Sequence, residues 1–319
     1  MKREYLDFLK CPVTGEDLKL NVYEEYKGKI INGKLYSSKA SYQITNSIPR
    51  FVENQGYSDN FGWQWNYWAK VQFESENTGR PMAGHTTKMF KSITELTNDK
   101  LKDKTILDIG CGPGRFVDVS RKLGAKLVIA LDYSAAIDTA KQNFADANGI
   151  FFVQGDALNL PFKDEVFDFT YSIGVLHHTP KPVKGVREAF RVLKKGGEFA
   201  ISVYKKGSYY DFISVQIWRR LFKLLWPIFG HRLPYVYSQF FGRINHYIFC
   251  FSPFLSYPIR LIFPSVTLPD VRWSVLDTFD SVTPSYQSAH TVYEVQSWFK
   301  KMNFKDTRIA SWENIIGKK

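Results

Sequence analysis

The chain has 319 residues, of which 44% are hydrophobic and 23% are charged, and its formal net charge is +12. This length and composition are those of a globular protein with a full core, and the basic balance favours an anionic partner such as nucleic acid, a membrane surface or a phosphorylated substrate. The cysteines, Cys11, Cys111 and Cys250, are too far apart for a disulfide framework, and Arg, His or Pro interrupts every apolar run before it reaches the length of a membrane span. The N-terminal residues lack the apolar core of a signal peptide, so we expect a cytoplasmic protein.

The N-terminal part of the chain is predicted to form two units. Residues 1–53 have the pattern of a small β-rich domain with short strands and turns. Residues 54–100 are aromatic and then helical, and the segment 61–68 is too rich in aromatic residues for a solvated linker. We expect this segment to pack on the domain that follows, either as core or as a cap over a ligand.

Strands and helices alternate from residue 104 onward. Apolar strands are expected at 105–109, 126–132, 150–153, 167–172 and 198–203. Helices are expected at 134–143 and 182–193, the second closed by a turn at 194–197, and a last helix at 291–301 precedes two short strands near Arg308 and Ile315. This alternation predicts an α/β fold with a doubly wound, mostly parallel, seven-stranded sheet, built from residues 101–203 and 287–319.

Residues 204–286 interrupt that rhythm after the fifth strand. Between residues 207 and 265 the chain carries one acidic residue, Asp211, and six basic ones, Arg219, Arg220, Lys223, Arg232, Arg243 and Arg260. Several polar residues from Gln216 to Lys223 fall at helical spacing among apolar neighbours, and Pro227 is expected to end that helix. We therefore predict an aromatic, basic, helical insertion.

A glycine-rich turn follows the first strand of the sheet. The glycines are Gly110, Gly112 and Gly114, so the spacing is Gly-x-Gly-x-Gly. A dinucleotide fingerprint would need glycine at Arg115, and a P-loop would need Gly-Lys-Ser/Thr, which is absent. Glycines at such a turn let the backbone bend tightly and approach a ligand.

Two acids follow the next strands of the predicted sheet. Asp132 ends the second strand, about 20 residues beyond the glycines, where a carboxylate accepts hydrogen bonds from ribose hydroxyls. Asp156 follows the third strand and can accept from an exocyclic adenine amine. Because ligands bind at the carboxyl edge of a parallel sheet, the two acids and the glycine turn together predict a nucleoside site.

These motifs resemble those of the class I S-adenosylmethionine-dependent methyltransferases, in particular the group related to quinone-biosynthesis methylases. The resemblance covers residues 101–203 and the final helix and strands, and includes the segments 107–114, 156–162 and 172–180. It implies a Rossmann-like fold, S-adenosylmethionine as cofactor, and methyl transfer by in-line displacement. By this resemblance the cofactor would be held by Asp108, Gly110, Cys111, Gly112 and Gly114 at the methionine, Asp132 and Tyr133 at the ribose, Asp156 and Ala157 at the adenine, and the backbone of Ser172 and Ile173 at the methionine amine.

The N-terminal unit resembles the small zinc-ribbon domain that activates some methyltransferases. The family pattern is Cys-Pro-x-Cys, but here Cys11-Pro12 is followed by Thr14, and the later cysteine pair is missing. We therefore predict a cysteine-poor ribbon that holds no zinc. An unrelated β-rich extension is the alternative.

The residues around the methyl acceptor are harder to assign. His177 is a candidate general base, because an imidazole can accept a proton at neutral pH, and His178 is a candidate acceptor contact. The alternative for either histidine is that it shapes the loop. Tyr286 and His290, which precede the last helix, could reach the same opening.

The insertion is expected to act as a lid over a small-molecule or lipid-linked acceptor and to contact an anionic membrane surface. A helical subdomain packed on the core or on another subunit is the alternative. Two other functions remain open: an RNA or protein methyltransferase, and a catalytically silent scaffold subunit that binds the cofactor. A nucleic-acid partner is not favoured, because residues 172–175 lack the Asn/Asp-Pro-Pro-aromatic motif of many amine-modifying members.

Overall fold

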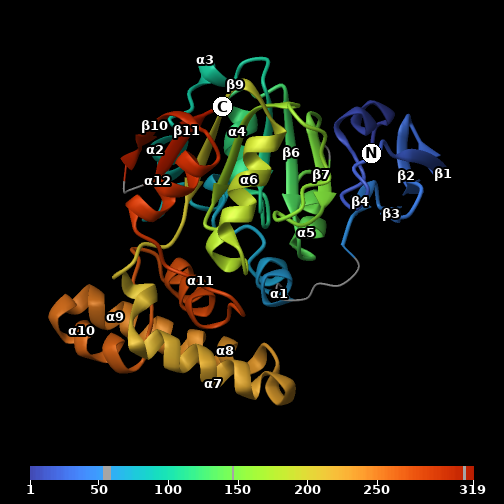
Figure 1. Ribbon diagram of the computed structural model, residues 1–319. Coiled ribbons are helices and arrows are strands. Elements are labelled where there is room, and N and C mark those ends of the chain that lie inside the picture. Colours follow the sequence, from blue (N-terminus) through green and yellow to red (C-terminus); the bar gives the residue numbers. More distant parts are fainter. Residues whose placement is uncertain (53–58, 146, 312–313) are drawn as a thin grey trace.

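The computed structural model describes residues 1–52, 59–145, 147–311 and 314–319. The predicted boundary between the first two units, at residues 53 and 54, lies outside the described residues. Figure 1 shows a central sheet flanked by helices, a small β unit beside it, and a layer of helices beneath it.

The central sheet contains the seven strands that the alternation predicted. Their order in space is β7-β6-β5-β8-β9-β11-β10, and β11 runs antiparallel to both of its neighbours while the other pairs within β5–β9 are parallel. The bounds are β5 (Thr105–Ile109), β6 (Leu127–Asp132), β7 (Ile150–Gln154), β8 (Phe167–Ile173), β9 (Leu193–Ser202), β10 (Lys305–Ile309) and β11 (Ile315–Lys318). The predicted doubly wound, mostly parallel sheet is confirmed.

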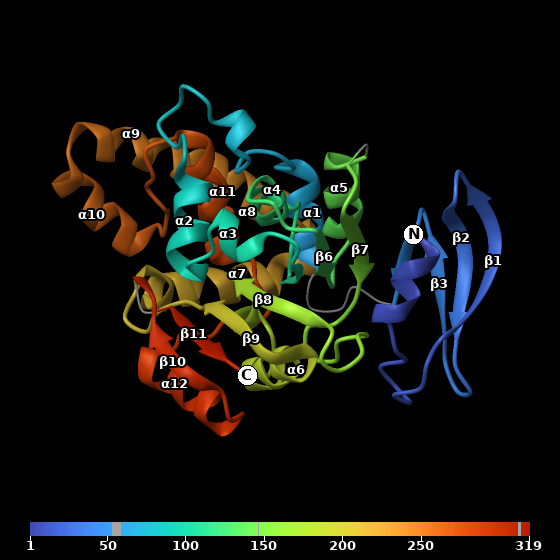
Figure 2. The ribbon, with the colours of Figure 1, turned by 90° about the horizontal axis from the view of Figure 1, so that it is seen from above.

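Helices cover both faces of this sheet. The bounds are α2 (His85–Thr94), α3 (Asn98–Leu101), α4 (Arg115–Lys122), α5 (Ala136–Asn143), α6 (Pro182–Val192) and α12 (Val292–Lys301). Figure 1 shows α6 on the near face and α4 behind the sheet, and Figure 2 agrees. Successive residues of β5 therefore face opposite helix layers, because side chains alternate between the two faces of a strand. Leu107 belongs to the same buried cluster as Val186 of α6, and Ile106 belongs to the same buried cluster as Val117 of α4.

The fifth strand begins earlier than predicted. Residues 194–197 were expected to form a turn, but they lie within β9. The reason is pairing with the C-terminus: the N–H of Gly196 donates to the carbonyl of Lys319, and the N–H of Lys319 donates to the carbonyl of Gly197, both over 2.8 Å. These hydrogen bonds, between residues more than 100 positions apart, extend the ladder through the glycines.

The N-terminal unit is a four-stranded antiparallel sheet at the β7 edge (Figure 2). Its elements are η1 (Arg3–Phe8), β1 (Lys19–Tyr26), β2 (Lys29–Tyr36), β3 (Ser41–Thr45) and β4 (Ile48–Arg50). β4 meets β7 through one registered pair, Arg50 with Gln154, and the Arg50 guanidinium also donates to both carboxylate oxygens of Asp138 on α5. These polar contacts connect the unit to the central sheet.

The insertion after β9 is helical, as predicted. It contains η5 (Tyr209–Asp211), α7 (Ile213–Phe229), α8 (Arg232–Tyr237), η6 (Ser238–Gly242), α9 (Arg243–Phe251), α10 (Pro253–Ile262) and α11 (Val271–Val282). Pro227 does not end α7, because it lies in the last turn and removes a single backbone donor. The helix ends at Gly230, which has a φ of 51°. No helix in the described ranges combines the length and hydrophobicity that a membrane crossing requires.

Candidate active site

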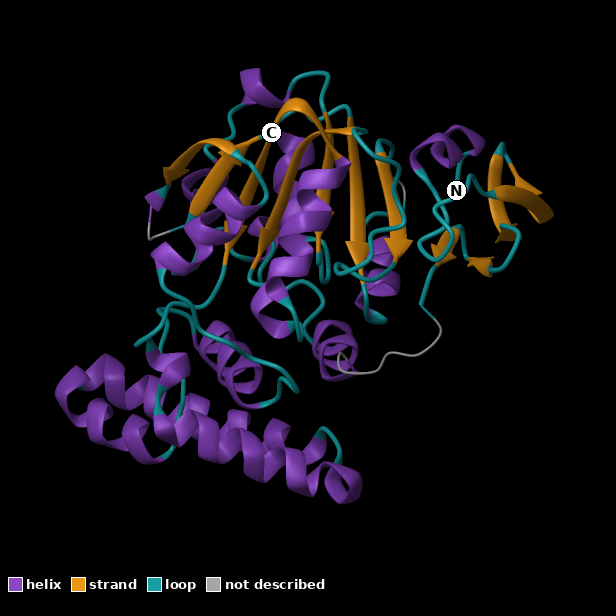
Figure 3. Cartoon of the chain, in the orientation of Figure 1, coloured by secondary structure: helices purple, strands orange, loops and turns teal. Residues whose placement is uncertain are grey.

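A cavity of about 300 Å³ lies at the carboxyl edge of β5, β6, β7 and β8. In Figure 3 the arrowheads of the parallel strands point toward α1 (Asp59–Tyr67) and α11, and both helices contribute to the cavity wall. Eight of the residues predicted for the site line this cavity: Gly110, Cys111, Gly112, Asp132, Tyr133, Ala157, Ile173 and His178.

The glycine turn needs its glycines. Gly110, Gly112 and Gly114 have φ values of 86°, 53° and 95°, which ordinary L-residues rarely adopt. A Cβ on Gly110 would lie 2.4 Å from a methyl carbon of Val175, and one on Gly112 would lie 3.3 Å from Nε1 of Trp65. The side chains of Val175 and of Trp65 on α1 therefore lie directly against the backbone of this turn.

Asp132 links this turn to the end of β6. Its Oδ2 accepts from the N–H of Gly112 over 2.8 Å, and its Oδ1 accepts from the N–H and the hydroxyl of Ser134 over 2.8 and 2.7 Å. Oδ1 therefore already accepts two hydrogen bonds, whereas Oδ2 accepts one and can still accept another. Burial raises the pKa of Asp132.

The third predicted contact region lies after β7. Gly155 and Ala157 line the cavity, whereas Asp156 between them does not. Oδ1 of Asp156 accepts from the N–H of Leu158 over 2.8 Å, so this side chain also shapes the local turn. Burial raises the pKa of Asp156.

Three other predicted cofactor residues lie behind the cavity wall. Asp108 is 1% exposed, burial raises its pKa to about 8, and its Oδ2 has no hydrogen-bond partner among the described residues. The hydroxyl of Ser172 donates to the carbonyl of Ile109 over 3.1 Å, so it faces the sheet. A Cβ on Gly114 would lie 2.6 Å from the ring of Phe144 rather than in the cavity.

The adjacent histidines have different surroundings. His178 lines the cavity, and its Nδ1 lies 3.1 Å from the carbonyl oxygen of Tyr286. His177 is fully buried outside the lining, its ring centroid lies 3.8 Å from that of Tyr204, and neither ring nitrogen has a partner in the described part of the chain. Burial lowers the pKa of both histidines.

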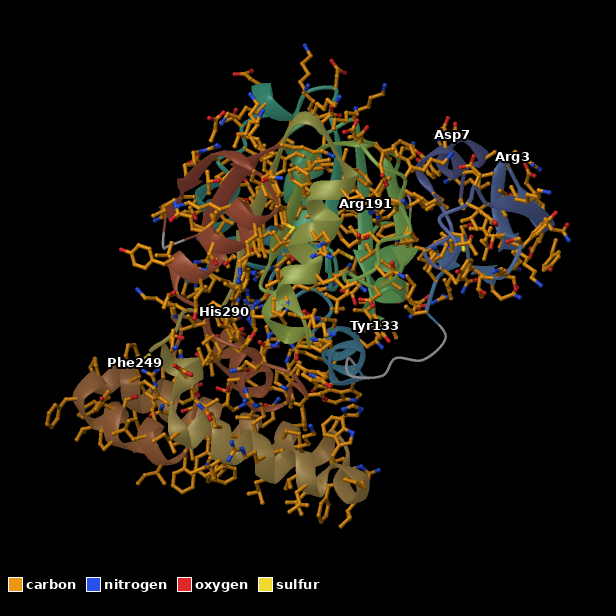
Figure 4. All side chains as sticks on the ribbon, viewed as in Figure 1. Arg3, Asp7, Tyr133, Arg191, Phe249 and His290 are labelled. Carbon is orange, nitrogen blue, oxygen red and sulfur yellow. The ribbon has the colours of Figure 1, made fainter. Side chains whose placement is uncertain are left out.

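The two residues predicted from the segment before α12 do not line the cavity. Tyr286 contributes the carbonyl that meets His178, and its side chain is 47% exposed. His290 lies 2.8 Å from the hydroxyl of Ser288 and packs edge-on against Trp298. Figure 4 shows Tyr133 beside α1 and His290 apart from it. This segment supports the histidine loop, because Ser288 donates to the carbonyl of His177.

Several cavity residues were not predicted. They are Arg115 on α4, Tyr204 and Tyr210 after β9, and Trp273, Asp277 and Asp280 on α11. Trp273, Asp277 and Asp280 lie four and then three residues apart, which places them on one stripe of α11. This spacing was the available signal, but although the insertion was expected to act as a lid, nothing in the sequence indicates which of its residues face the cavity. Phe61 and Trp65 of the aromatic segment also line the cavity, as a cap would.

Charged groups are concentrated on the α11 side. Burial lowers the pKa of Arg115 to about 10, while burial and the neighbouring Asp280 raise the pKa of Asp277 to about 7. Asp280 accepts from Nε2 of Gln64 over 3.0 Å and from the hydroxyl of Tyr204 over 2.9 Å. The cavity therefore has a glycine-lined, nucleoside-compatible side and an acidic, aromatic side.

Comparison with known proteins agrees with this geometry. Residues 107–201 match the family described as "Methyltransferase domain". A demethylmenaquinone methyltransferase of Staphylococcus epidermidis is 33% identical over 147 residues, which are 45% of this chain and 60% of that protein. A Mus musculus protein named "Probable tRNA methyltransferase 9B" is 30% identical over 132 residues, which are 40% of this chain and 28% of that protein.

A Methanococcus maripaludis structure described as a "putative S-adenosyl-L-methionine-dependent methyltransferase" superposes with a TM-score of 0.45 and 21% identity, over 84% of this chain and 96% of that chain. The chain spans less than a third of the length of the mouse relative and 60% of the length of the staphylococcal one.

Proposed function

We propose that this chain, whose residues 107–201 form a methyltransferase domain of the S-adenosylmethionine-dependent class, transfers a methyl group to a small-molecule or lipid-linked acceptor. The observation that carries the proposal is the hydrogen bond from Gly112 to Asp132, which brings a glycine turn and a carboxylate suited to ribose hydroxyls to one cavity. The quinone-methylase relatives support a small acceptor, and the tRNA relative makes RNA the alternative.

The residues present fit this cofactor. Gly110 and Gly112 line the cavity without a Cβ, for which Val175 and Trp65 leave too little room, and Oδ2 of Asp132 keeps acceptor capacity for a ribose hydroxyl. In the proposed complex Tyr133 shares the ribose, and Asp156 and Ala157 border the adenine. Asp108, Cys111, Gly114, Ser172 and Ile173 complete the site, by direct contact or by holding the turn. The bound cofactor supplies a methyl group that a sulfonium already activates.

The remaining residues orient the acceptor and exclude water. Phe61 and Trp65 cover the cavity from α1, and Trp273 covers it from α11. An enclosed site of this kind holds two reactants in line and keeps water away from them. His178, which faces the cavity, is the better placed of the two histidines to touch the acceptor.

The outer face of the insertion bears on where the acceptor is found. On α7, Ile213, Ile217, Leu221, Leu224 and Ile228 form one exposed stripe opposite the buried Val215 and Phe222. Further along, Phe251 of α9 and Phe254 of α10 are each 85% exposed. Figure 1 shows α7–α10 as a layer on the side of α11 away from the sheet. An exposed apolar surface of this extent is typical of an interaction site.

The positive charge of this layer supports an anionic membrane as its partner. Residues 212–269 contain no Asp or Glu, and they contain all six of the basic residues counted in the insertion. Arg220 and Lys223, which are both exposed, flank the apolar stripe of α7. Apolar residues bordered by Lys and Arg suit the interface of an anionic lipid bilayer. We therefore propose that α7–α10 rest on an anionic membrane and that the cavity behind α11 receives a lipid-linked acceptor.

Vesicle binding tests the membrane proposal. The protein should sediment with vesicles of phosphatidylglycerol and phosphatidylcholine, and much less with phosphatidylcholine alone. The double variant Leu224→Glu/Ile228→Glu should lose this binding, because both side chains are 74% exposed in the proposed contact. Val13→Glu is the matched control, since Val13 is 70% exposed in the N-terminal unit. The proposal is contradicted if the double variant still binds the anionic vesicles. It is also contradicted if light scattering shows a wild-type dimer that the double variant no longer forms.

Methyl transfer tests the acceptor class. Tritiated S-adenosylmethionine is incubated with the protein and either anionic vesicles that contain total cell lipid, or total tRNA. Label in the extracted lipid is the expected result. Label in the tRNA contradicts the lipid assignment, and its absence from every fraction contradicts the proposed activity.

A further inference from the structure

The insertion contributes an acidic stripe to the cavity. Trp273, Asp277 and Asp280 line it from one face of α11, while Phe279 on the opposite face packs in a cluster with Trp68. Asp270 caps the start of α11 by accepting from the N–H of Arg272. The helix is thus fixed at its N-terminus and along its apolar face, so its carboxylates have a defined position.

The two carboxylates of this stripe have unequal surroundings. Asp280 accepts hydrogen bonds on both oxygens, from Gln64 and from Tyr204. Asp277 has no hydrogen-bond or ion-pair partner among the described residues, although the charges of Arg115 and Asp280 act on it. A carboxylate that faces a cavity without a partner is available to a ligand.

The walls beside Asp277 are aromatic. Tyr204 and Tyr210 stack with ring centroids 3.7 Å apart, and both line the cavity with Phe61, Trp65 and Trp273. Gln64, which is fully buried, donates to Asp280 but leaves its own Oε1 without a donor in the described part of the chain. This side of the cavity therefore offers the carboxylate of Asp277 as a hydrogen-bond acceptor within aromatic walls, and Gln64 lies behind them.

We infer that Asp277 receives the proton that the acceptor loses, so that the acceptor is methylated on a hydroxyl oxygen or an amine nitrogen. The inference rests on the proposed function. The acceptor heteroatom forms a bond to the methyl carbon, the carbon–sulfur bond breaks with its electron pair passing to sulfur, and the O–H or N–H proton passes to Asp277. Asp280 is a positioning residue, which connects α11 to Gln64 and Tyr204.

The charged neighbours of Asp277 allow this role. The charge of Asp280 on α11 raises the pKa of Asp277, and the charge of Arg115 on α4 lowers it. The charge of Asp277 in turn raises the pKa of the hydroxyls of Tyr204 and Tyr210. His178 and His85 also line the cavity, and burial lowers the pKa of each, which favours their neutral forms. The sulfonium of a cofactor held in the same cavity would favour the carboxylate of Asp277 over its protonated form.

Calorimetric titration tests the inference without requiring the acceptor. S-adenosylmethionine and S-adenosylhomocysteine, which lacks the sulfonium charge, are titrated at pH 7 in buffers of different ionisation enthalpy. Asp277 should contribute about half a proton to the release on binding S-adenosylmethionine, because burial and Asp280 raise its pKa to about 7, and any proton that Asp108 loses is common to wild type and variant. Asp277→Asn should abolish this contribution and reduce the preference for S-adenosylmethionine roughly three- to tenfold.

The variants separate the possible outcomes. Asp277→Asn should fold normally, because no hydrogen bond of Asp277 is lost. Asp7→Asn is the control, since Asp7 is exposed on the N-terminal unit, away from the cavity (Figure 4). The inference is overturned if Asp277→Asn leaves unchanged both the proton release and the preference for S-adenosylmethionine over S-adenosylhomocysteine. It is also overturned if His178→Gln, and not Asp277→Asn, loses them. In both cases the proposed cofactor site stands. Absence of any S-adenosylmethionine binding by the wild-type protein overturns the proposed function instead.

Discussion

The N–H of Gly112 donates to Oδ2 of Asp132 over 2.8 Å, which joins the turn after β5 to the end of β6. The same turn receives a second link to β6, because the N–H groups of Gly110 and Cys111 both donate to the carbonyl of Leu131. The turn is therefore held in place before any ligand binds. Such preorganisation lowers the ordering cost of binding.

Gly110→Ala should abolish cofactor binding and destabilise the protein. The substitution adds a Cβ 2.4 Å from Val175 at a φ of 86°, so it combines a clash with backbone strain of about 1–2 kcal/mol. Gly124→Ala is the matched control, since Gly124 has a φ of 93° and no atom within 4 Å of the added Cβ. Thermal melts and S-adenosylmethionine titrations compare the two. Equal losses in both variants would show that the contact with Val175 is unimportant.

Asp108→Asn should make the protein more stable at alkaline pH relative to wild type. Burial raises the pKa of Asp108 in the folded state to about 8, from an ordinary value of 3.8. Between these values the folded protein holds a proton that the unfolded chain has released, so the contribution of Asp108 to stability falls as pH rises and levels off above about pH 8. The difference in melting temperature between variant and wild type should therefore grow from pH 5 to pH 8. A constant difference contradicts the assignment.

His177→Phe should retain both stability and cofactor affinity. The ring of His177 is buried against Tyr204, and its nitrogens have no partner among the described residues. An apolar ring keeps the stacking and removes two buried polar atoms that are costly without partners. Thermal melts and titration of S-adenosylmethionine provide the measurement. The sequence-based prediction of His177 as general base requires instead a large loss of methyl transfer in this variant.

The N-terminal unit should accept zinc once cysteines are introduced. The thiol of Cys11 lies 3.3 Å from the Ser37 hydroxyl and 3.4 Å from the Thr14 N–H; burial raises its pKa, but these hydrogen bonds and that of Tyr42 bring it down to about 6. Positions 11 and 14 and positions 37 and 40 have the spacing of two zinc knuckles.

The variant Thr14→Cys/Ser37→Cys/Ala40→Cys is therefore expected to bind one zinc ion and to lose stability when a chelator is added. Metal analysis and melting with and without chelator give the result, with Cys11→Ser added as the control. A variant without zinc contradicts the zinc-ribbon relationship.

The sheet and the cofactor side of the cavity could be predicted because their signals are local. Apolar runs gave β5 to β8, and Gly110, Gly112 and Asp132 follow strand ends within about 20 residues of one another. The acidic side could not be predicted in this way. Asp277 and Trp273 reach the cavity only because α11 folds back to the sheet edge, about 160 residues after the glycine turn.

The errors have the same origin. The sequence 194–197 has the composition of a turn, but β9 extends through it because Lys319 pairs with Gly196 and Gly197. Pro227 is tolerated because α7 ends three residues later in any case. In the first case pairing with a distant strand outweighed the local preference for a turn, and in the second the position of the proline near the helix end made its effect small.

Calorimetric titration of S-adenosylmethionine into wild type and Asp132→Ala tests the central claim most directly, with Asp7→Ala as control. The claim predicts saturable one-to-one binding to wild type and to the control. It predicts at least roughly tenfold weaker binding to Asp132→Ala, since the variant loses both the ribose contact and the hydrogen bond from Gly112. Equal affinity for all three proteins, or none for the wild type, would contradict a cofactor site built on Gly112 and Asp132.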